Sequence, residues 1–475
     1  MNLQPVARLR GGSGGRLLVL MLITSVLTPS ARALECQLQR GFIGTEASSK
    51  TSGGSGWNNT GDGFGASQSV NAYLSAKAGC EIQSGVSATL QAGAEHARQF
   101  SPLGEYEGAR QQSLLVVNQG YLSWAMRDDL ALDIGKIRRS SGYLLAISPL
   151  DVLRNPVGYL RNVQVNQSGA RWRNFYDEGS FGLSASLFRD EGTFELLALP
   201  QLTHGRNPRN SVADWTMLER TNASDRYGLS YTSGGFDRFN PTLVLLAGQT
   251  PTLALGGSGA LNDKIILNIE GALTQGQKWR HLNGQAAQQL QQQHAVDNLF
   301  QQDSQHPGAE LGVGLRYAGQ YETEYGMEYY TQSQGYSRTE WRTMFDTAGW
   351  LNGGYQQTIP PAWLTPEVRE GYRQYARWMA AEVDNSGRYG YLQGKHYLSA
   401  WISRQNSGVL RPSVTLSGLV NLVDGSSMMT LQVNSYLTDA LEGYVGTRAA
   451  LGSTRSEFGF FGEKGMFYAG LRMVW

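Results

Sequence analysis

Apolar and polar residues alternate with a period of two in many segments of the chain. In 264–273, for example, Ile265, Leu267 and Ile269 share one parity while Asn268 lies on the other. The same pattern recurs at 85–95, 130–134, 183–187, 311–317, 325–329, 414–422 and 429–438. Successive side chains on a strand point to opposite faces, so each segment predicts a strand with one apolar and one polar face.

A soluble β-sandwich also alternates, but three features favour a membrane barrel. The polar parity is rich in Gly, Ser, Thr, Asn and Gln rather than Lys, as suits a watery interior. The segments run about ten residues, the length with which a tilted strand crosses hydrocarbon. Aromatic residues such as Tyr73, Trp124 and Tyr444 tend to lie near segment ends, where interfacial girdles form. From residue 34 onward, no apolar run is long enough for a spanning helix.

These features predict an all-β protein, a transmembrane antiparallel β-barrel with long extracellular loops that carry short helices. Closing the sheet removes the unpaired edges that lipid cannot satisfy. We count roughly 18 to 20 segments and predict 18 strands, because bacterial single-chain barrels use even numbers. The count depends on the segments 193–202, 238–249 and 251–262.

Residues 1–33 have the features of a secretory signal peptide. Three arginines precede an apolar run at 17–27, and Ala31 and Ala33 are the small residues that a signal peptidase reads. The alternative is an N-terminal anchor helix, for which the run is too short. We therefore predict a signal peptide at 1–33, a barrel at 34–475 and the outer membrane of a Gram-negative bacterium as the location.

The composition agrees with a hollow barrel. The chain has 59 Gly, 23 Tyr and 11 Trp with 17% charged residues. A packed core of this size would usually divide into domains, and no charged or Pro-rich linker marks a division. Arg8, Arg10, Arg16 and Arg32 leave with the signal, so residues 34–475 carry a net charge of 36 − 39 = −3. This balance argues against nucleic acid as a partner.

The two cysteines, Cys36 and Cys80, permit a disulfide in an oxidising periplasm. It would tie the first strand to the next one. The alternative, two unpaired cysteines, stays open because sequence does not place their Cα atoms.

The last nine residues alternate strictly and end on an aromatic residue. The apolar positions are Phe467, Ala469, Leu471, Met473 and Trp475. Gly470 lies on the other parity, followed by apolar or aromatic residues three and five positions later. This tail resembles the terminal strand by which outer-membrane β-barrel proteins are recognised for insertion, with Tyr468 at a polar position as a departure. The resemblance implies the barrel-assembly machinery as a partner, and outer-membrane lipid and lipopolysaccharide as surroundings.

Two insertions interrupt the strand rhythm, at about 275–308 and 336–388. The first is Gln-rich and predicts a helix at 286–300. The second contains Thr365 and Pro366, a cap followed by Pro at the first helical position, and predicts a helix to about Val383. External loops are the long ones in such barrels, so both insertions are expected outside the cell or folded into the mouth.

The stretch 135–156 runs from Gly135-Lys136 through Gly142-Tyr143 to Asp151 and Asn155-Pro156. It resembles a stretch found in porin-like and exporter barrels, of which the alginate exporter is a relative in general plan. Where such relatives often carry Trp-Gly, this chain has Ser140 and Ser141. The resemblance makes Lys136, Arg138 and Asp151 candidates for lining a pore. A plain turn between two strands is the alternative.

Arginine outnumbers lysine by 29 to 7 beyond residue 33. Arg171, Arg173, Arg316, Arg448 and Arg472 fall on the polar parity and are candidates for contacting a solute. Guanidinium groups stay charged in a pore and bind carboxylate and phosphate, which predicts a preference for anions. In the alternative, these arginines pair with lumenal acids such as Asp133, Glu270, Glu310 and Glu328.

The sequence gives little support for a catalytic or a cofactor-binding function. The six histidines lack metal-ligand spacing, so neither a metal nor another cofactor is expected. His396 beside Ser399 is the best candidate for a hydrolase pair, and a structural His is the simpler explanation.

Transport is the leading hypothesis, because it uses both a closed barrel and a polar lumen. We predict a channel and no enzyme. The cargo would be a small solute or a polysaccharide, and an exporter of an acidic polysaccharide would be fed by periplasmic partners. A non-conducting structural or adhesive barrel and a barrel-borne hydrolase are the alternatives.

Overall fold

The computed structural model describes residues 35–55, 68–100, 111–155, 177–204, 215–236, 238–388, 392–406 and 410–475. The predicted signal peptide, Arg171 and Arg173 lie outside these ranges. The strands of the main sheet are β1 (Glu35–Ser52), β2 (Gln68–Gln83), β3 (Val86–Gln99), β4 (Gln111–Arg127), β5 (Leu130–Ile137), β6 (Ser180–Arg189), β7 (Gly192–Leu199), β8 (Arg226–Ser233) and β9 (Phe239–Gly248). They continue with β10 (Thr252–Asn262), β11 (Ile265–Gln275), β14 (Pro307–Ala318), β15 (Thr323–Gln332), β16 (His396–Gln405), β17 (Ser413–Asn421), β18 (Ser427–Tyr436), β19 (Leu441–Leu451) and β20 (Glu463–Val474).

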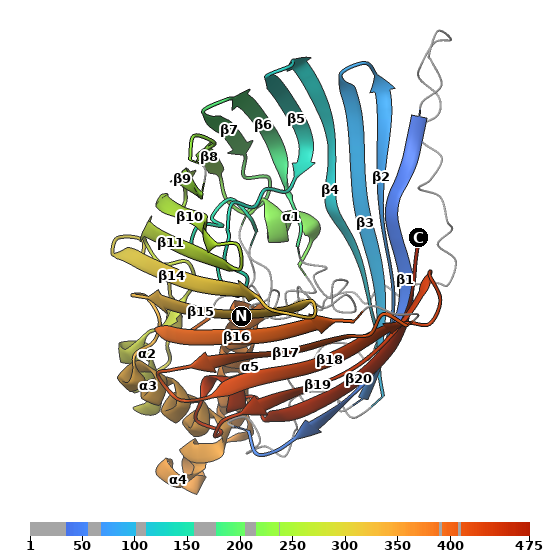
Figure 1. Ribbon diagram of the computed structural model, residues 1–475. Coiled ribbons are helices and arrows are strands. Elements are labelled where there is room, and N and C mark those ends of the chain that lie inside the picture. Colours follow the sequence, from blue (N-terminus) through green and yellow to red (C-terminus); the bar gives the residue numbers. More distant parts are fainter. Residues whose placement is uncertain are drawn as a thin grey trace, which may run out of the picture.

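These 18 strands form one closed antiparallel barrel. Each strand pairs with its neighbours in chain order, and β1 pairs with β20 from Phe42 opposite Val474 to Ser52 opposite Glu463. Figure 1 shows the strands following one another around the ring. The predicted fold class and strand number are confirmed, and the three segments on which the count depended form β7, β9 and β10.

The alternation divides the barrel wall into an apolar outside and a more polar inside. On β11, Ile269 is 41% exposed on the outside, whereas Asn268 and Glu270 face inward and are buried. Exposed outward leucines occur on most strands. Leucine that stays exposed in so many copies on a closed wall is suited to lipid rather than to water.

The aromatic girdle is only partly as expected. Trp124, Tyr317 and Tyr325 face outward near short turns, at 49%, 41% and 44% exposure. Tyr73 and Tyr444 instead face inward and are buried, and their hydroxyl groups lie 3.3 Å apart. Their parity, not their position near a segment end, decides the face on which they lie.

Connections alternate between two rims because consecutive strands are antiparallel. One rim carries short turns, such as those after β2, β4, β6 and β10, and also the start of β1 and the end of β20. The other rim carries the long connections, including those after β5, β7, β11 and β15. Barrels of this architecture keep short turns on the periplasmic side, which makes the long-loop rim the external one.

The two long insertions fold together at the long-loop rim. They contain β12 (His281–Leu282), α2 (Gly284–Gln291), β13 (Phe300–Gln301), α3 (Arg338–Gly349), η4 (Trp350–Gly354), α4 (Tyr355–Thr358), η5 (Pro361–Trp363) and α5 (Pro366–Arg388). Leu290, Met344, Met379 and Phe460 contribute to one buried core, so these segments form a helical cap. Figure 1 shows α2, α3 and α4 grouped at one end of the barrel.

Local sequence explains the helices of the cap. Ser337 accepts a hydrogen bond from the backbone N–H of Glu340, and Glu340 reciprocates, which forms a capping box that starts α3. The predicted helix at 286–300 is shorter than expected: α2 ends at Gln291, and Gln293 has a left-handed φ of 68°. No helix in the described ranges is both long enough and apolar enough to traverse a bilayer.

Cys36 and Cys80 form a disulfide between β1 and β2. The two residues lie directly opposite each other in the register of these strands. The bond lies close to the short-turn rim, where β1 begins.

Candidate functional site: a loop held inside the barrel

The connection after β5 turns into the barrel and lies along its inner wall. We call residues 138–155 the inner loop. Its Leu144, Leu150 and Leu153 are buried, and Leu150 and Leu153 pack in one cluster with Val244 and Ala254 of β9 and β10. The loop therefore occupies part of the space that an 18-stranded barrel would otherwise leave to water.

Glycines in the wall make room for the inner loop. A Cβ added at Gly312 would overlap Leu144, and one added at Gly228 would meet Leu153. Gly256 likewise faces Leu150, with a Cβ contact of 3.1 Å. Because these glycines lie on strands β8, β10 and β14, the loop follows the wall across several strands.

Glu270 of β11 holds the middle of the inner loop. Its Oε1 accepts hydrogen bonds from the backbone N–H groups of Tyr143 and Leu144, the latter at 2.8 Å. Its Oε2 accepts from the Ser148 hydroxyl and from the backbone N–H of Leu150 at 3.1 Å. One inward carboxylate thus satisfies four donors of a buried segment that belongs to no strand.

Glu328 of β15 adds a second attachment. Its Oε1 and Oε2 accept from the backbone N–H groups of Leu145 and Ala146, each at 2.7 Å. Glu328 is 3% exposed. Two neighbouring carboxylates on the wall therefore bind one stretch of backbone.

Arginines and acids alternate at the two ends of the inner loop. Arg138 donates to Asp177 at 3.2 Å, and Arg154 donates to the same carboxylate at 2.8 Å through its Nε. Arg139 is ion-paired with both Asp133 and Glu195. Both signs of charge therefore line this part of the interior.

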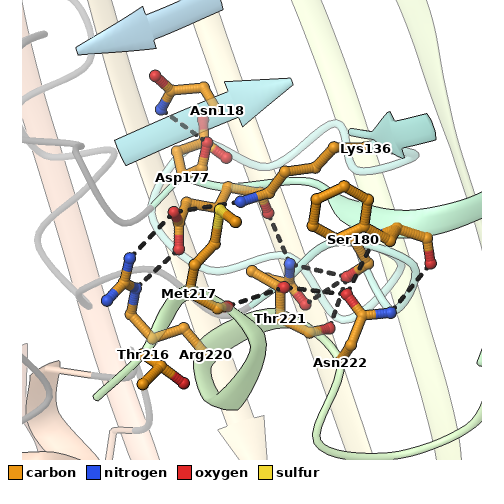
Figure 2. Close-up of polar contacts among 12 residues, drawn as sticks. Asn118, Lys136, Asp177, Ser180, Thr216, Met217, Arg220, Thr221 and Asn222 are labelled. Carbon is orange, nitrogen blue, oxygen red and sulfur yellow. Dashed lines mark hydrogen bonds and ion pairs between the residues drawn. The ribbon is translucent and has the colours of Figure 1, made fainter. Parts of the chain in front are cut away.

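A second, fully buried cluster ties the base of the inner loop to the next long connection. Lys136 Nζ lies 3.3 Å from Glu178, and Arg220 Nε donates to Glu178 at 2.8 Å. Arg220 lies on α1 (Met217–Thr221), whose N-terminus Thr216 caps. Figure 2 shows the side chains of Lys136 and Arg220 in one cluster of polar contacts. Lys136 and Glu178 are each only 1% exposed, so one buried carboxylate serves as the acidic partner of two cations within the wall.

The predicted basic pore residues that the structure describes all have acidic partners. Arg316 Nη2 lies 2.7 Å from Glu324, Arg448 pairs with Glu463, and Arg472 pairs with Glu442. Asp151 accepts from the backbone N–H of Ser141 at 3.1 Å and pairs with Arg154 at 3.6 Å, which draws the two ends of the inner loop together. Lys136 and Arg138 belong to the two clusters described above.

The sequence predicts that Glu270 and Glu328 lie in the lumen, as acids that could pair with arginines. Both residues do face inward. Their hydrogen-bond partners are instead backbone N–H groups of the inner loop. No local pattern identifies such partners, because each pair lies more than 100 residues apart in the chain.

The structure contradicts the alternative of a hydrolase pair at His396 and Ser399. His396 faces outward, where its Nδ1 lies 2.9 Å from the Tyr329 hydroxyl, while Ser399 is 3% exposed on the inward parity. Residues three apart on a strand point to opposite faces, so these two side chains cannot cooperate. Within the described ranges, no group of three or more metal-binding side chains comes together.

The fold places the chain among transmembrane β-barrels with an internal loop. No protein-family model matches the sequence, and no curated protein matches it. Similar solved structures are bacterial outer-membrane porins. OccAB1 of Acinetobacter baumannii is 9% identical, with 92% of this chain and 95% of that chain covered and a TM-score of 0.49.

Two further solved structures are similar at the level of fold. OprD of Pseudomonas aeruginosa is 8% identical over 94% of this chain and 96% of that chain, with a TM-score of 0.46. OmpF of Salmonella typhi is 11% identical over 93% of this chain and 97% of that chain, with a TM-score of 0.41. At these identities, the likeness concerns the fold alone.

Proposed function

We propose that the protein is a passive channel for small solutes in the outer membrane of a Gram-negative bacterium. The observation that carries the proposal is the inner loop, which is held against the polar interior of a closed barrel by Glu270 and Glu328. A loop in this position narrows the lumen at a fixed place. A channel that discriminates by size needs such a fixed constriction.

The same loop favours small solutes over a polymer as the cargo. Six hydrogen bonds from the inner loop to two carboxylates resist displacement of the segment from the wall. Polysaccharide export, with periplasmic partners feeding the barrel, is the second candidate. It rests on the resemblance of 135–156 to exporter barrels and requires the inner loop to leave room for a chain of sugars.

The charges around the constriction support weak rather than strong selectivity for anions. Arg138 is 32% exposed and shares Asp177 with Arg154, so its charge is the least compensated of this group. Arg139 is matched by two acids. A mixed lining orients solutes that carry both charges, and it discriminates less between small cations and anions.

Planar-bilayer recording tests the proposal. The refolded barrel is expected to give steady, ohmic conductance steps, and size exclusion measured with neutral polymers should report a lumen narrower than that of an unobstructed barrel. Folded protein that gives no conductance would overturn the channel and favour a structural or adhesive barrel. The hydrolase alternative has no support from His396 and Ser399, because their side chains lie on opposite faces of β16.

Ion selectivity is tested separately by the reversal potential in a salt gradient. Arg138→Gln is expected to move the reversal potential toward cation preference, because it removes the most accessible cation of the group. Arg189→Gln is a suitable control, since Arg189 pairs with Asp129 at the opposite, short-turn rim. An equal response of both variants would remove Arg138 from the selectivity of the channel.

A further inference from the structure

A small cavity with a mixed polar and apolar lining lies where the helical cap meets the wall, away from the inner loop. It has a volume of about 250 Å³. Its lining is Arg338, Trp341, Arg342, Phe345, Val423, Asp424 and Arg455. Three of these residues are arginines, contributed by α3 and by the β19–β20 connection.

The arginine side chains come together because of helix and loop geometry. Arg338 and Arg342 are four residues apart on α3 and therefore share one face of the helix. Arg455 comes from residues 452–462 and reaches α3 through an ion pair with Asp346 at 2.5 Å. Trp341 and Phe345, stacked with ring centroids 5.1 Å apart, form the apolar floor.

Two of the three arginines in this cavity, Arg338 and Arg342, form no ion pair with a residue that the structure describes. Arg342 makes no hydrogen bond or ion pair with any residue that the structure describes. Arg338 donates only to the backbone carbonyl oxygen of Val423, at 3.3 Å. Asp424 also lines the cavity. Its two oxygens accept hydrogen bonds from Ser426 and from the backbone N–H of Glu457, which are neutral donors, so its negative charge offsets part of the arginine charge.

The cavity lies at the height where the apolar outer surface ends. Leu422 is the last outward leucine after β17, at 48% exposure, and Leu451 is the last one on β19, at 51%. Val423 and Asp424 follow Leu422 directly, and Arg455 lies four residues beyond Leu451. Because these leucines mark the edge of the lipid-facing surface on the external side, the arginines lie at the level of lipid headgroups.

We propose that Arg338, Arg342 and Arg455 form a binding site for a phosphate group carried by a glycolipid headgroup of the outer leaflet. Guanidinium groups bind phosphate oxygens through paired, charge-assisted hydrogen bonds, and Arg338 and Arg342 supply two such groups that have no acidic partner among the described residues. The N-terminus of α3, whose first residue is Arg338, adds favourable backbone dipoles. The lipid would hold the helical cap to the membrane surface beside the channel mouth.

The test is calorimetric titration of the full-length barrel in zwitterionic detergent with bisphosphorylated lipid A. Arg338→Gln/Arg342→Gln is expected to weaken binding by about tenfold or more, the loss typical of a charge-assisted hydrogen bond. The matched control is Arg373→Gln/Arg377→Gln. It removes two exposed arginines at the same four-residue spacing from α5 of the same cap, and it should bind like the parent protein.

Titrations with three further ligands identify the source of the phosphate and the class of ligand. Dephosphorylated lipid A, inorganic phosphate and an oligouronate are each expected to bind much more weakly than bisphosphorylated lipid A. Equal or tighter binding of any one of these three ligands, or equal loss in both double variants, would overturn the proposal. If the Arg338/Arg342 variant does not give heat-modifiable gel mobility, Arg455→Gln, an exposed position, replaces it.

The proposal rests on the outer-membrane location but not on conduction. The arginine cavity and the inner loop involve different strands and different residues. Loss of lipid binding with normal conductance would concern the cavity alone, whereas loss of conductance with normal lipid binding would concern the channel alone.

Discussion

The backbone N–H of Leu144 donates a 2.8 Å hydrogen bond to the carboxylate of Glu270, which lies 126 residues further along the chain. This contact joins a loop that leaves β5 to the face of β11 that points into the barrel. A wall residue therefore determines where the internal segment lies. The position of the inner loop therefore depends on the barrel wall as much as on the sequence of the loop itself.

Removal of both wall carboxylates should release the inner loop. In Glu270→Ala/Glu328→Ala, each buried N–H left without an acceptor costs roughly 1–3 kcal/mol, so the loop is expected to leave the wall. Single-channel recording should then show altered and noisier conductance. Glu324→Ala is the control, because Glu324 faces inward on the same strand as Glu328 but pairs with Arg316 rather than with the loop.

A steric variant displaces the same loop without removing a charge. Gly312→Val places side-chain atoms where Leu144 lies, whereas Gly271→Val adds them on the outward parity, where an added Cβ meets only a backbone oxygen at 3.5 Å. Conductance is expected to change in the first variant only. If neither the steric nor the charge variant changes conductance while the barrel stays folded, the inner loop does not control passage.

Glu178 should be important for stability because two buried cations depend on it. Glu178→Gln removes the carboxylate that both Lys136 and Arg220 contact, and breaking a buried ion pair in this way typically costs about 3–5 kcal/mol. The denaturant midpoint of the refolded barrel should fall accordingly. Asp129→Asn, at the exposed pair with Arg189, should change stability by only about 0–1 kcal/mol.

The disulfide should stabilise the barrel by restricting its unfolded state. Cys36 and Cys80 are 44 residues apart in the chain, and closing a loop of this length contributes about 2–4 kcal/mol. Reduction of the disulfide is expected to lower the urea midpoint of unfolding relative to the oxidised parent protein. The Cys36→Ser/Cys80→Ser variant should show the same lower midpoint. The double variant should no longer respond to reductant, and a response would point to another redox-sensitive feature.

The helical cap should be more stable in mild acid than in mild alkali. Burial raises the pKa of Glu382 to about 7, although Arg280 at 3.3 Å opposes the shift, and burial likewise raises the pKa of Glu457 to about 7. In the unfolded chain both carboxyl groups titrate near 4.5. These two carboxyl groups therefore bind more protons in the folded cap between about pH 4.5 and 7, and their contribution to its stability falls as the pH rises through that window. Burial lowers the pKa of His281, which also lies in the cap, to about 4, and this single shift opposes the two carboxyl groups below about pH 6.5.

Limited proteolysis of the cap at pH 5 and pH 8 measures this dependence. Cleavage is expected to be slower at pH 5. Glu382→Gln should reduce the difference between the two pH values, while Glu370→Gln, at an exposed position of the same helix, should leave it unchanged. Faster cleavage at pH 5 in the parent protein would contradict the expectation that the two carboxyl groups outweigh His281.

The sequence predicted the barrel well because strand periodicity is a local property. Ile269 and Glu270 are adjacent, and their alternation alone indicates which of them faces outward. The same rule, applied to His396 and Ser399, would have excluded the hydrolase pair. It would also have placed Tyr73 inside the barrel and not in a girdle.

The partners of the inward residues could not be predicted in this way. Arg316, Arg448 and Arg472 were expected to face the lumen, but their acidic neighbours depend on the register between strands. The contact of Glu270 with Leu144 depends on the path of a loop through the interior. Such contacts are decided by tertiary packing, which no repeat in the sequence encodes.

The seam between β1 and β20 has a consequence for biogenesis. It joins the first strand of the barrel to the last one, so pairing cannot be completed until the final strand has been synthesised and exported. Until then, both edges of the growing sheet carry unpaired N–H and C=O groups that hydrocarbon cannot solvate. The nascent sheet must therefore be shielded along two edges while it enters the bilayer, and closure is the last step.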